Sequence, residues 1–106
     1  MSLAQQINDR LRAGALVVIV EESDELLARE AALAAAQQFQ PVKALSASDQ
    51  DAMQAVQDHK GGDGTLVLFD FLRVFGDNPV SVRNVREVAL QQRDGAYAKM
   101  ILVEAP

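Results

Sequence analysis

The sequence predicts a three-layer α/β domain, with a mainly parallel sheet of about four strands and helices on both faces. Short, strongly apolar runs alternate with longer segments whose apolar residues recur every three or four positions. Turns rich in glycine or proline separate these segments. Strands that alternate with helices form parallel sheets covered on both faces. A chain of 106 residues has the length of one domain.

The chain is expected to open with a short helix followed by a buried strand. Apolar residues at every fourth position from Leu3 to Leu11 predict a helix that ends at Gly14. Residues 15–21 then form a continuous run rich in β-branched side chains, which is typical of a strand covered on both faces. We therefore expect the first strand of the sheet there.

A second helix is expected from Ser23, which can cap it, to about residue 39. Pro41 blocks its continuation, and residues 42–45 predict a weak second strand. The helix would approach the sheet closely because it is rich in alanine. Its expected inner face comprises Leu26, Leu27, Ala31 and Ala34.

A third helix is expected over residues 49–60, with Ser48 and Asp51 resembling a capping box. Its expected buried stripe is Ala52, Met53 and Val56, and His59 is expected to be a cation at its C-terminus.

Residues 61–64, with three glycines, break the chain before a third strand over residues 65–70. A loop then leads to Asn78, which caps a helix that Pro79 begins. Asp94 and Gly95 turn the chain into a last strand over residues 98–104. The inward residues of the last helix are expected to be Val82, Val85 and Ala89.

Acidic residues at the ends of the predicted strands are the candidate site residues. Asp70 ends the third strand, as does the metal-holding acid of nucleotide hydrolases. Glu21 and Glu22 end the first strand, and a parallel sheet would place them near Asp70. Three such carboxylates could bind Mg²⁺. The alternatives are a polar strand end for Asp70, and a solvated loop for the two glutamates.

The sequence argues against ordinary ATP binding. No G-x-x-x-x-G-K-[ST] motif occurs, and residues 21–25 contain four acids but no glycine or lysine. Such a loop would repel a triphosphate. We therefore expect no catalytic residues, no cofactor and no enzymatic activity in this chain.

Composition limits the partners. The formal net charge of −5 disfavours nonspecific binding to nucleic acid, and the absence of cysteine excludes disulfides and thiolate metal sites. No apolar run is long enough for a membrane span, and Asp9, Arg10 and Arg12 interrupt any signal peptide. A soluble cytoplasmic domain is expected. Arg83 and Arg86 share a helix face that either docks an acidic protein partner or is simply solvated.

Several blocks resemble the N-terminal domain of a group of AAA+ ATPases known from cyanobacteria, chloroplast genomes and other bacteria. They are residues 11–22, a helix end, an Arg-Ala turn and an apolar strand, then residues 68–71, 77–89 and 100–106. The resemblance implies a degenerate P-loop or Rossmann-like fold without a nucleotide site. It also implies an interaction or regulatory role beside a downstream ATPase module. Residues 1–106 would then be a fragment of a longer protein, or else a compact four-strand version.

The chain also resembles response-regulator receiver domains. In that alternative Glu21 and Glu22 hold Mg²⁺ and Asp70 accepts a phosphoryl group. The chain departs from the receiver pattern in having Glu in place of Asp, and Glu104 or Ala105 in place of a hydroxyl residue. It also lacks a fifth strand with its lysine.

Overall fold

The computed structural model describes residues 2–47, 51–60, 62–90 and 98–104. The helices and strands alternate along the chain, as the sequence predicts, with one additional short helix. They are α1 (Leu3–Arg12), β1 (Val17–Glu21), α2 (Glu25–Ala36), β2 (Val42–Ser46), α3 (Ala52–His59), β3 (Thr65–Phe69), α4 (Phe71–Phe75), α5 (Pro79–Leu90) and β4 (Lys99–Glu104).

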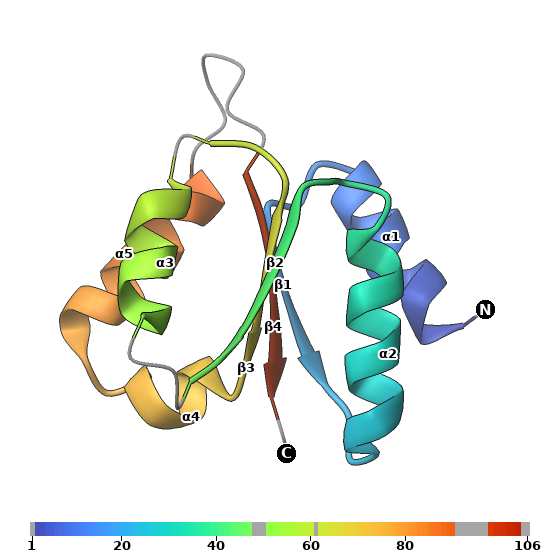
Figure 1. Cartoon of the computed structure of the whole chain (residues 1–106), viewed down its shortest axis with the longest axis horizontal. Helices are drawn as coiled ribbons and strands as arrows, with labels where there is room; N and C mark the ends of the chain where they lie inside the picture. Colours follow the sequence, from blue (N-terminus) through green and yellow to red (C-terminus); the bar gives the residue numbers. More distant parts are fainter. Residues whose placement is uncertain (1, 48–50, 61, 91–97, 105–106) are drawn as a thin grey trace.

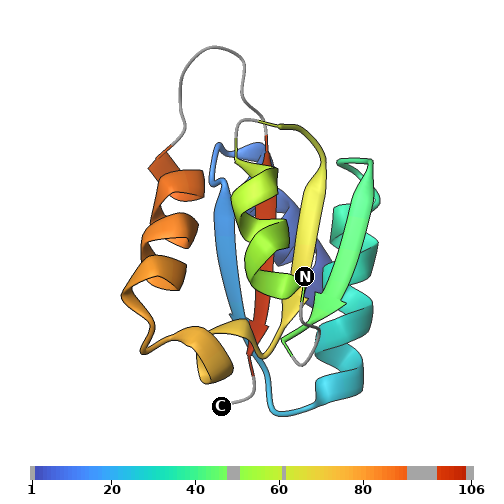
Figure 2. The same ribbon diagram turned by 60° about the vertical axis from the view of Figure 1, so that its left-hand side comes forward.

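The four strands form one parallel sheet, which Figure 1 shows nearly edge-on. Their order is β1-β4-β3-β2 (Figure 2). Helices α1 and α2 cover one face, and α3 and α5 cover the other (Figure 1). This arrangement confirms the predicted three-layer α/β class. The order places β4 between β1 and β3, which differs from the 2-1-3-4-5 order of flavodoxin-like domains. Strand β1 was expected to be covered on both faces, but it lies at an edge of the sheet and its Ile19 side chain is 51% exposed. Strand β3, in contrast, is central and buried along its whole length.

The layer of α1 and α2 packs on the sheet through small side chains. Helix α2 presents a stripe of five alanines at helical spacing, and they meet Val67, Ile101 and Val103 of the sheet. The expected inner face of α2 was therefore wrong except at Ala31. Leu26 is 66% exposed, and the smaller alanines take its expected place because they allow close approach. The buried alanines are Ala28, Ala31, Ala32, Ala35 and Ala36.

The opposite layer has larger side chains. Leu66 and Leu68 of β3, with Met100 and Leu102 of β4, pack against α3, α5 and the fully buried Phe71 of α4. The buried residues of α5 are Ser81, Asn84 and Val88, whereas the predicted Val82, Val85 and Ala89 are only half-buried. The stripe predicted for α3 is confirmed at Ala52 and Val56, joined by Ala55.

The helix ends differ in detail from the predictions. Asp24, not Ser23, caps α2, because its Oδ1 accepts a hydrogen bond from the Leu27 amide at 3.0 Å. Asn78 Oδ1 accepts from the Val80 and Ser81 amides, so it satisfies the first turn of α5 as predicted. Helix α4 was not predicted. The capping residue Ser48, the helix start at Asp49 and the turn at residues 94–95 lie outside the described residues.

Candidate functional site

Carboxylates lie at the carboxyl ends of three of the four parallel strands. Glu21 of β1 and Glu104 of β4 are partners in the parallel register, and Asp70 follows the end of β3. Because β4 lies between β1 and β3, Glu104 separates Glu21 from Asp70. The expectation that Glu21 and Glu22 approach Asp70 holds only in part: Glu22 and Asp70 line one crevice, and Glu21 does not.

This crevice is too small for a ligand. Its volume is about 10 Å³, whereas pockets for small molecules have volumes of ~300–1,000 Å³. Side chains from α2 fill the space, and the Arg29 guanidinium lies 4.2 Å from the centre of the Phe69 ring. The crevice could hold a single water molecule at most. Its lining comprises Glu22, Glu25, Ala28, Arg29, Phe69, Asp70, Val103 and Glu104.

The N-terminus of α2 is satisfied by carboxylates of the chain itself. Glu22 Oε1 accepts a hydrogen bond from the Asp24 amide at 3.2 Å, and Asp24 Oδ1 accepts one from the Leu27 amide. In nucleotide-binding α/β proteins, free amides at this helix terminus receive a phosphate. In this chain the carboxylates of Glu22 and Asp24 lie at that helix terminus, and their negative charge would repel a phosphate.

Glu104, the last residue of β4, is buried, with only 8% of its surface exposed. Its two carboxylate oxygens accept hydrogen bonds from the amides of Leu72 and Arg73, at 3.3 and 3.1 Å, in the first turn of α4. Burial raises the pKa of Glu104, and these amide hydrogen bonds oppose that rise. This role of Glu104 was not predicted from the sequence. The only sequence signal for it is an acid at the end of an otherwise apolar strand. Helix α4, whose amides it binds, is too short to show a helical periodicity in the sequence.

Asp70 has a left-handed backbone conformation, with φ of 62°. Aspartate tolerates this region better than most residues. Its amide donates a hydrogen bond to the Val103 carbonyl at 2.8 Å, and its side chain is half-buried. Among the described residues, no three His, Cys, Asp or Glu side chains converge to hold a metal ion. Glu21, Glu22 and Asp70 therefore do not form the predicted cluster in this structure.

Arg83 and Arg86 lie one turn apart on the exposed face of α5. They line an open groove of about 520 Å³ together with Gly76, Asp77, Pro79 and Val82. Among the described residues, neither guanidinium forms an ion pair. The groove is far larger than the crevice of about 10 Å³ beside Asp70.

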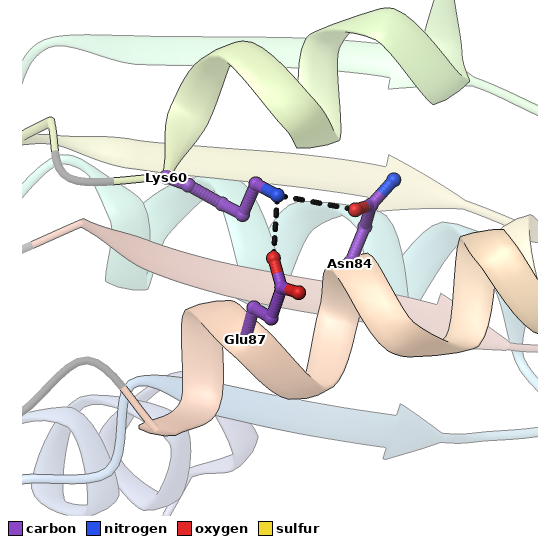
Figure 3. A network of polar contacts seen from close by, with 3 residues as sticks. All are labelled: Lys60, Asn84 and Glu87. Atoms are coloured by element: carbon purple, nitrogen blue, oxygen red, sulfur yellow. Dashed lines mark hydrogen bonds and ion pairs between the residues drawn. The ribbon is translucent and has the colours of Figure 1, made fainter.

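Glu87, one turn after Arg83 on α5, forms its ion pair with Lys60. Lys60 Nζ lies 2.5 Å from Glu87 Oε2 and donates to Asn84 Oδ1 at 3.2 Å (Figure 3). The hydrogen bond and charge of Lys60 lower the pKa of Glu87, with a smaller contribution from Arg83. The network joins the end of α3 to α5, and it directs the Glu87 carboxylate toward Lys60.

His59 lies at the end of α3, as predicted, but its surroundings do not favour a cation. Burial lowers the pKa of the imidazole, although a hydrogen bond to the Lys99 carbonyl opposes this effect. The residue therefore joins α3 to the start of β4 as a largely neutral side chain near neutral pH.

Comparison of the chain with protein-family models, curated proteins and solved structures found no match. No helix in the described part of the chain is long and apolar enough to cross a bilayer. The features that bear on function are the carboxylates at the ends of β1, β3 and β4 and the groove lined by Arg83 and Arg86.

Proposed function

We propose that this chain is a non-catalytic, cytoplasmic interaction or regulatory domain, of the degenerate P-loop type found at the N-terminus of some AAA+ ATPases. Its partner would be another protein or a downstream ATPase module. The observation that carries this proposal is the α2 N-terminus, where Glu22 and Asp24 occupy the amides that a nucleotide phosphate would need. The crevice beside it, of about 10 Å³, also supports the proposal because it has no room for a nucleotide.

The docking surface in this proposal is the groove that contains Arg83 and Arg86. Both side chains are exposed, without an ion pair in the described part of the chain, and they border an opening of about 520 Å³. Guanidinium groups bind carboxylates with paired hydrogen bonds. An acidic segment of a partner protein is the chemistry that fits them.

Calorimetry with Mg-ATP tests the absence of nucleotide binding. We expect no heat of binding at millimolar nucleotide, because two carboxylates repel the phosphates at the helix terminus. A micromolar dissociation constant for Mg-ATP would contradict the proposal that this P-loop-type domain has lost its nucleotide site.

NMR titration with a ten-residue polyglutamate peptide tests the docking surface. We expect amide shifts centred on α5, and at least a tenfold loss of affinity in Arg83→Glu/Arg86→Glu. The control Arg12→Glu/Lys43→Glu changes the formal net charge equally, from −5 to −9, at two other exposed positions. Equal losses in both variants would mean that net charge alone governs binding, and would refute the groove.

The receiver-like alternative, with Asp70 as phosphoacceptor, has less support. Glu104 lies between the ends of β1 and β3, and no acidic cluster for Mg²⁺ forms among the described residues. Acetyl phosphate with Mg²⁺ should therefore leave the protein mass unchanged. A stoichiometric phosphoryl adduct that Asp70→Ala abolishes would favour the alternative.

A further inference from the structure

The groove on α5 follows one face of the helix and the loop before it. Its helical residues are spaced i, i+3, i+4 and i+7, so their side chains share a face. They are Pro79, Val82, Arg83 and Arg86. Because the remaining lining, Gly76 and Asp77, belongs to the preceding loop, the groove is open on its other side. Pockets for free small molecules enclose most of the ligand. An open groove instead suits a chain segment that the rest of a partner protein holds in place.

The chemistry of the groove changes along its length. The exposed Asp77 lies at its start, Pro79 and Val82 form an apolar middle section, and the exposed Arg83 and Arg86 follow. Pro79 to Arg83 is a step of four residues, as is Val82 to Arg86, and each step covers ~6 Å along the helix axis. The groove therefore has a negative, an apolar and a positive section in that order.

The positive section is open to a carboxylate from another molecule. Glu87, the acid one turn after Arg83, is directed toward Lys60 of the α3 end (Figure 3). Within the described residues, neither Arg83 nor Arg86 forms an ion pair. An external carboxylate can therefore bind these guanidinium groups without displacing a partner that the structure describes.

The loop at the start of the groove is held between two helices. The Gly76 amide donates a hydrogen bond to the Leu72 carbonyl of α4 at 2.7 Å, and the Asn78 amide donates to the Phe75 carbonyl at 3.0 Å. Asn78 Oδ1 also caps α5. A groove that is already formed loses little conformational freedom when it binds a segment.

We propose that this groove binds an extended segment of a partner protein with a basic, an apolar and an acidic residue at alternate positions. The inference rests on the proposed function and adds the basic and apolar positions to it. Alternate side chains of an extended segment lie on one side, ~6.7 Å apart, which matches the ~6 Å steps along α5. The acidic residue binds Arg83 or Arg86, the apolar side chain covers Pro79 and Val82, and the basic residue contacts Asp77.

NMR titration with capped pentapeptides tests the apolar position. The probe is lysine-serine-leucine-serine-glutamate, the comparison peptide has serine in place of leucine, and both are made in either chain direction. We expect the tighter leucine peptide to bind about tenfold more strongly, because its side chain removes ~55 Å² of apolar surface from water. Equal affinities of the leucine and serine peptides for the wild type would overturn the proposal.

Two threonine variants locate that preference on α5. Val82→Thr keeps the shape of the side chain but adds a hydroxyl group to the apolar section, so the preference for leucine should fall to about twofold. Val80→Thr is the matched control, because Val80 is 58% exposed and does not line the groove. It should keep the wild-type preference, and an equal loss in the two variants would refute the apolar section.

A charge reversal tests the basic position. The wild type should prefer the lysine probe about threefold over glutamate-serine-leucine-serine-glutamate, because Asp77 attracts a cation. Asp77→Lys should reverse that preference. Asp9→Lys makes the same change in net charge at an exposed position of α1 and should retain the wild-type preference. An unchanged preference in Asp77→Lys, or a reversal in both variants, would overturn the basic position.

The outcomes separate this inference from the proposed function. If polyglutamate binds at Arg83 and Arg86 but leucine and serine pentapeptides bind alike, the acidic docking surface stands and the pattern proposed here fails. If Arg83→Glu/Arg86→Glu changes the affinity for neither polyglutamate nor the leucine peptide, both proposals fail. A leucine preference that this double variant and Val82→Thr both remove would support both.

Discussion

His59 Nε2 lies 2.7 Å from the carbonyl oxygen of Lys99 and thereby joins the end of α3 to the first residue of β4. The two residues are forty positions apart in the sequence, and the ring is partly buried where they meet. Burial lowers the pKa of the imidazole, so the folded state favours the neutral ring over the charged one.

The first prediction is a loss of stability in mild acid that depends on His59. A histidine whose pKa is lower in the folded state binds more protons when unfolded. Its stabilising contribution is therefore present above the unfolded value of 6.5 and is lost as pH falls below it. Urea unfolding should show that the free energy of unfolding decreases more between pH 7.5 and pH 5.5 in the wild type than in His59→Gln. Glutamine can keep the hydrogen bond but cannot titrate. An identical decrease in both proteins would mean that His59 does not contribute.

Glu104→Ala should destabilise the domain by about 1–3 kcal/mol, because two amides of the first turn of α4 lose their acceptor in a buried site. Glu21→Ala is the control, since Glu21 is the register partner of Glu104 but is exposed. Its cost should be within about 0.5 kcal/mol. Denaturant unfolding measures both, and equal effects would show that Glu104 is not a cap.

Glu104 should also give a pH dependence of the opposite sign to that of His59. Its folded pKa is raised above the ordinary value of 4.5, so the folded state binds more protons. The stability contributed by Glu104 should rise as pH falls through the folded pKa toward 4.5. Glu104→Gln should remove this component in unfolding curves between pH 4.5 and 7. An unchanged pH profile would contradict the raised pKa.

Gly64→Ala should cost at least about 2 kcal/mol. Gly64 has φ of 77°, which costs an L-residue roughly 1–2 kcal/mol. A Cβ atom there would also lie 2.3 Å from the Pro41 carbonyl oxygen. Gly62→Ala is the matched control, because its nearest neighbour would be 3.4 Å away. Thermal melts that shift equally for the two variants would refute this account of the β2–β3 junction.

Two leucines provide a test of the layer assignment. Leu68 is fully buried in β3, so Leu68→Ala should cost ~2–4 kcal/mol. Leu26 was expected to face the sheet but is 66% exposed, so Leu26→Ala should cost within about 0.5 kcal/mol. If the two variants unfolded at the same denaturant concentration, the orientation of α2 would be wrong.

The sequence predicts the strands well because a continuous apolar run such as residues 65–69 has few other uses in a short domain. Helix α4 escaped prediction because five residues cannot show a helical period. The inner face of α2 was misjudged because hydrophobicity ranks leucine above alanine, while close packing on the sheet selects the smaller residue. Strand order was beyond reach, since local patterns do not encode it. The position of Glu104 between Glu21 and Asp70 depends on that order.

The alanine stripe of α2 has a consequence for the entropy of folding. Alanine has no rotamers to lose when it is buried, whereas each larger core side chain loses up to about 2 kcal/mol of rotamer freedom. The α2 layer therefore orders almost entirely through its backbone, and its neighbours have few alternative side-chain arrangements with which to absorb a change. A single added methylene at Ala32 should displace the helix as a rigid unit instead of being accommodated by repacking.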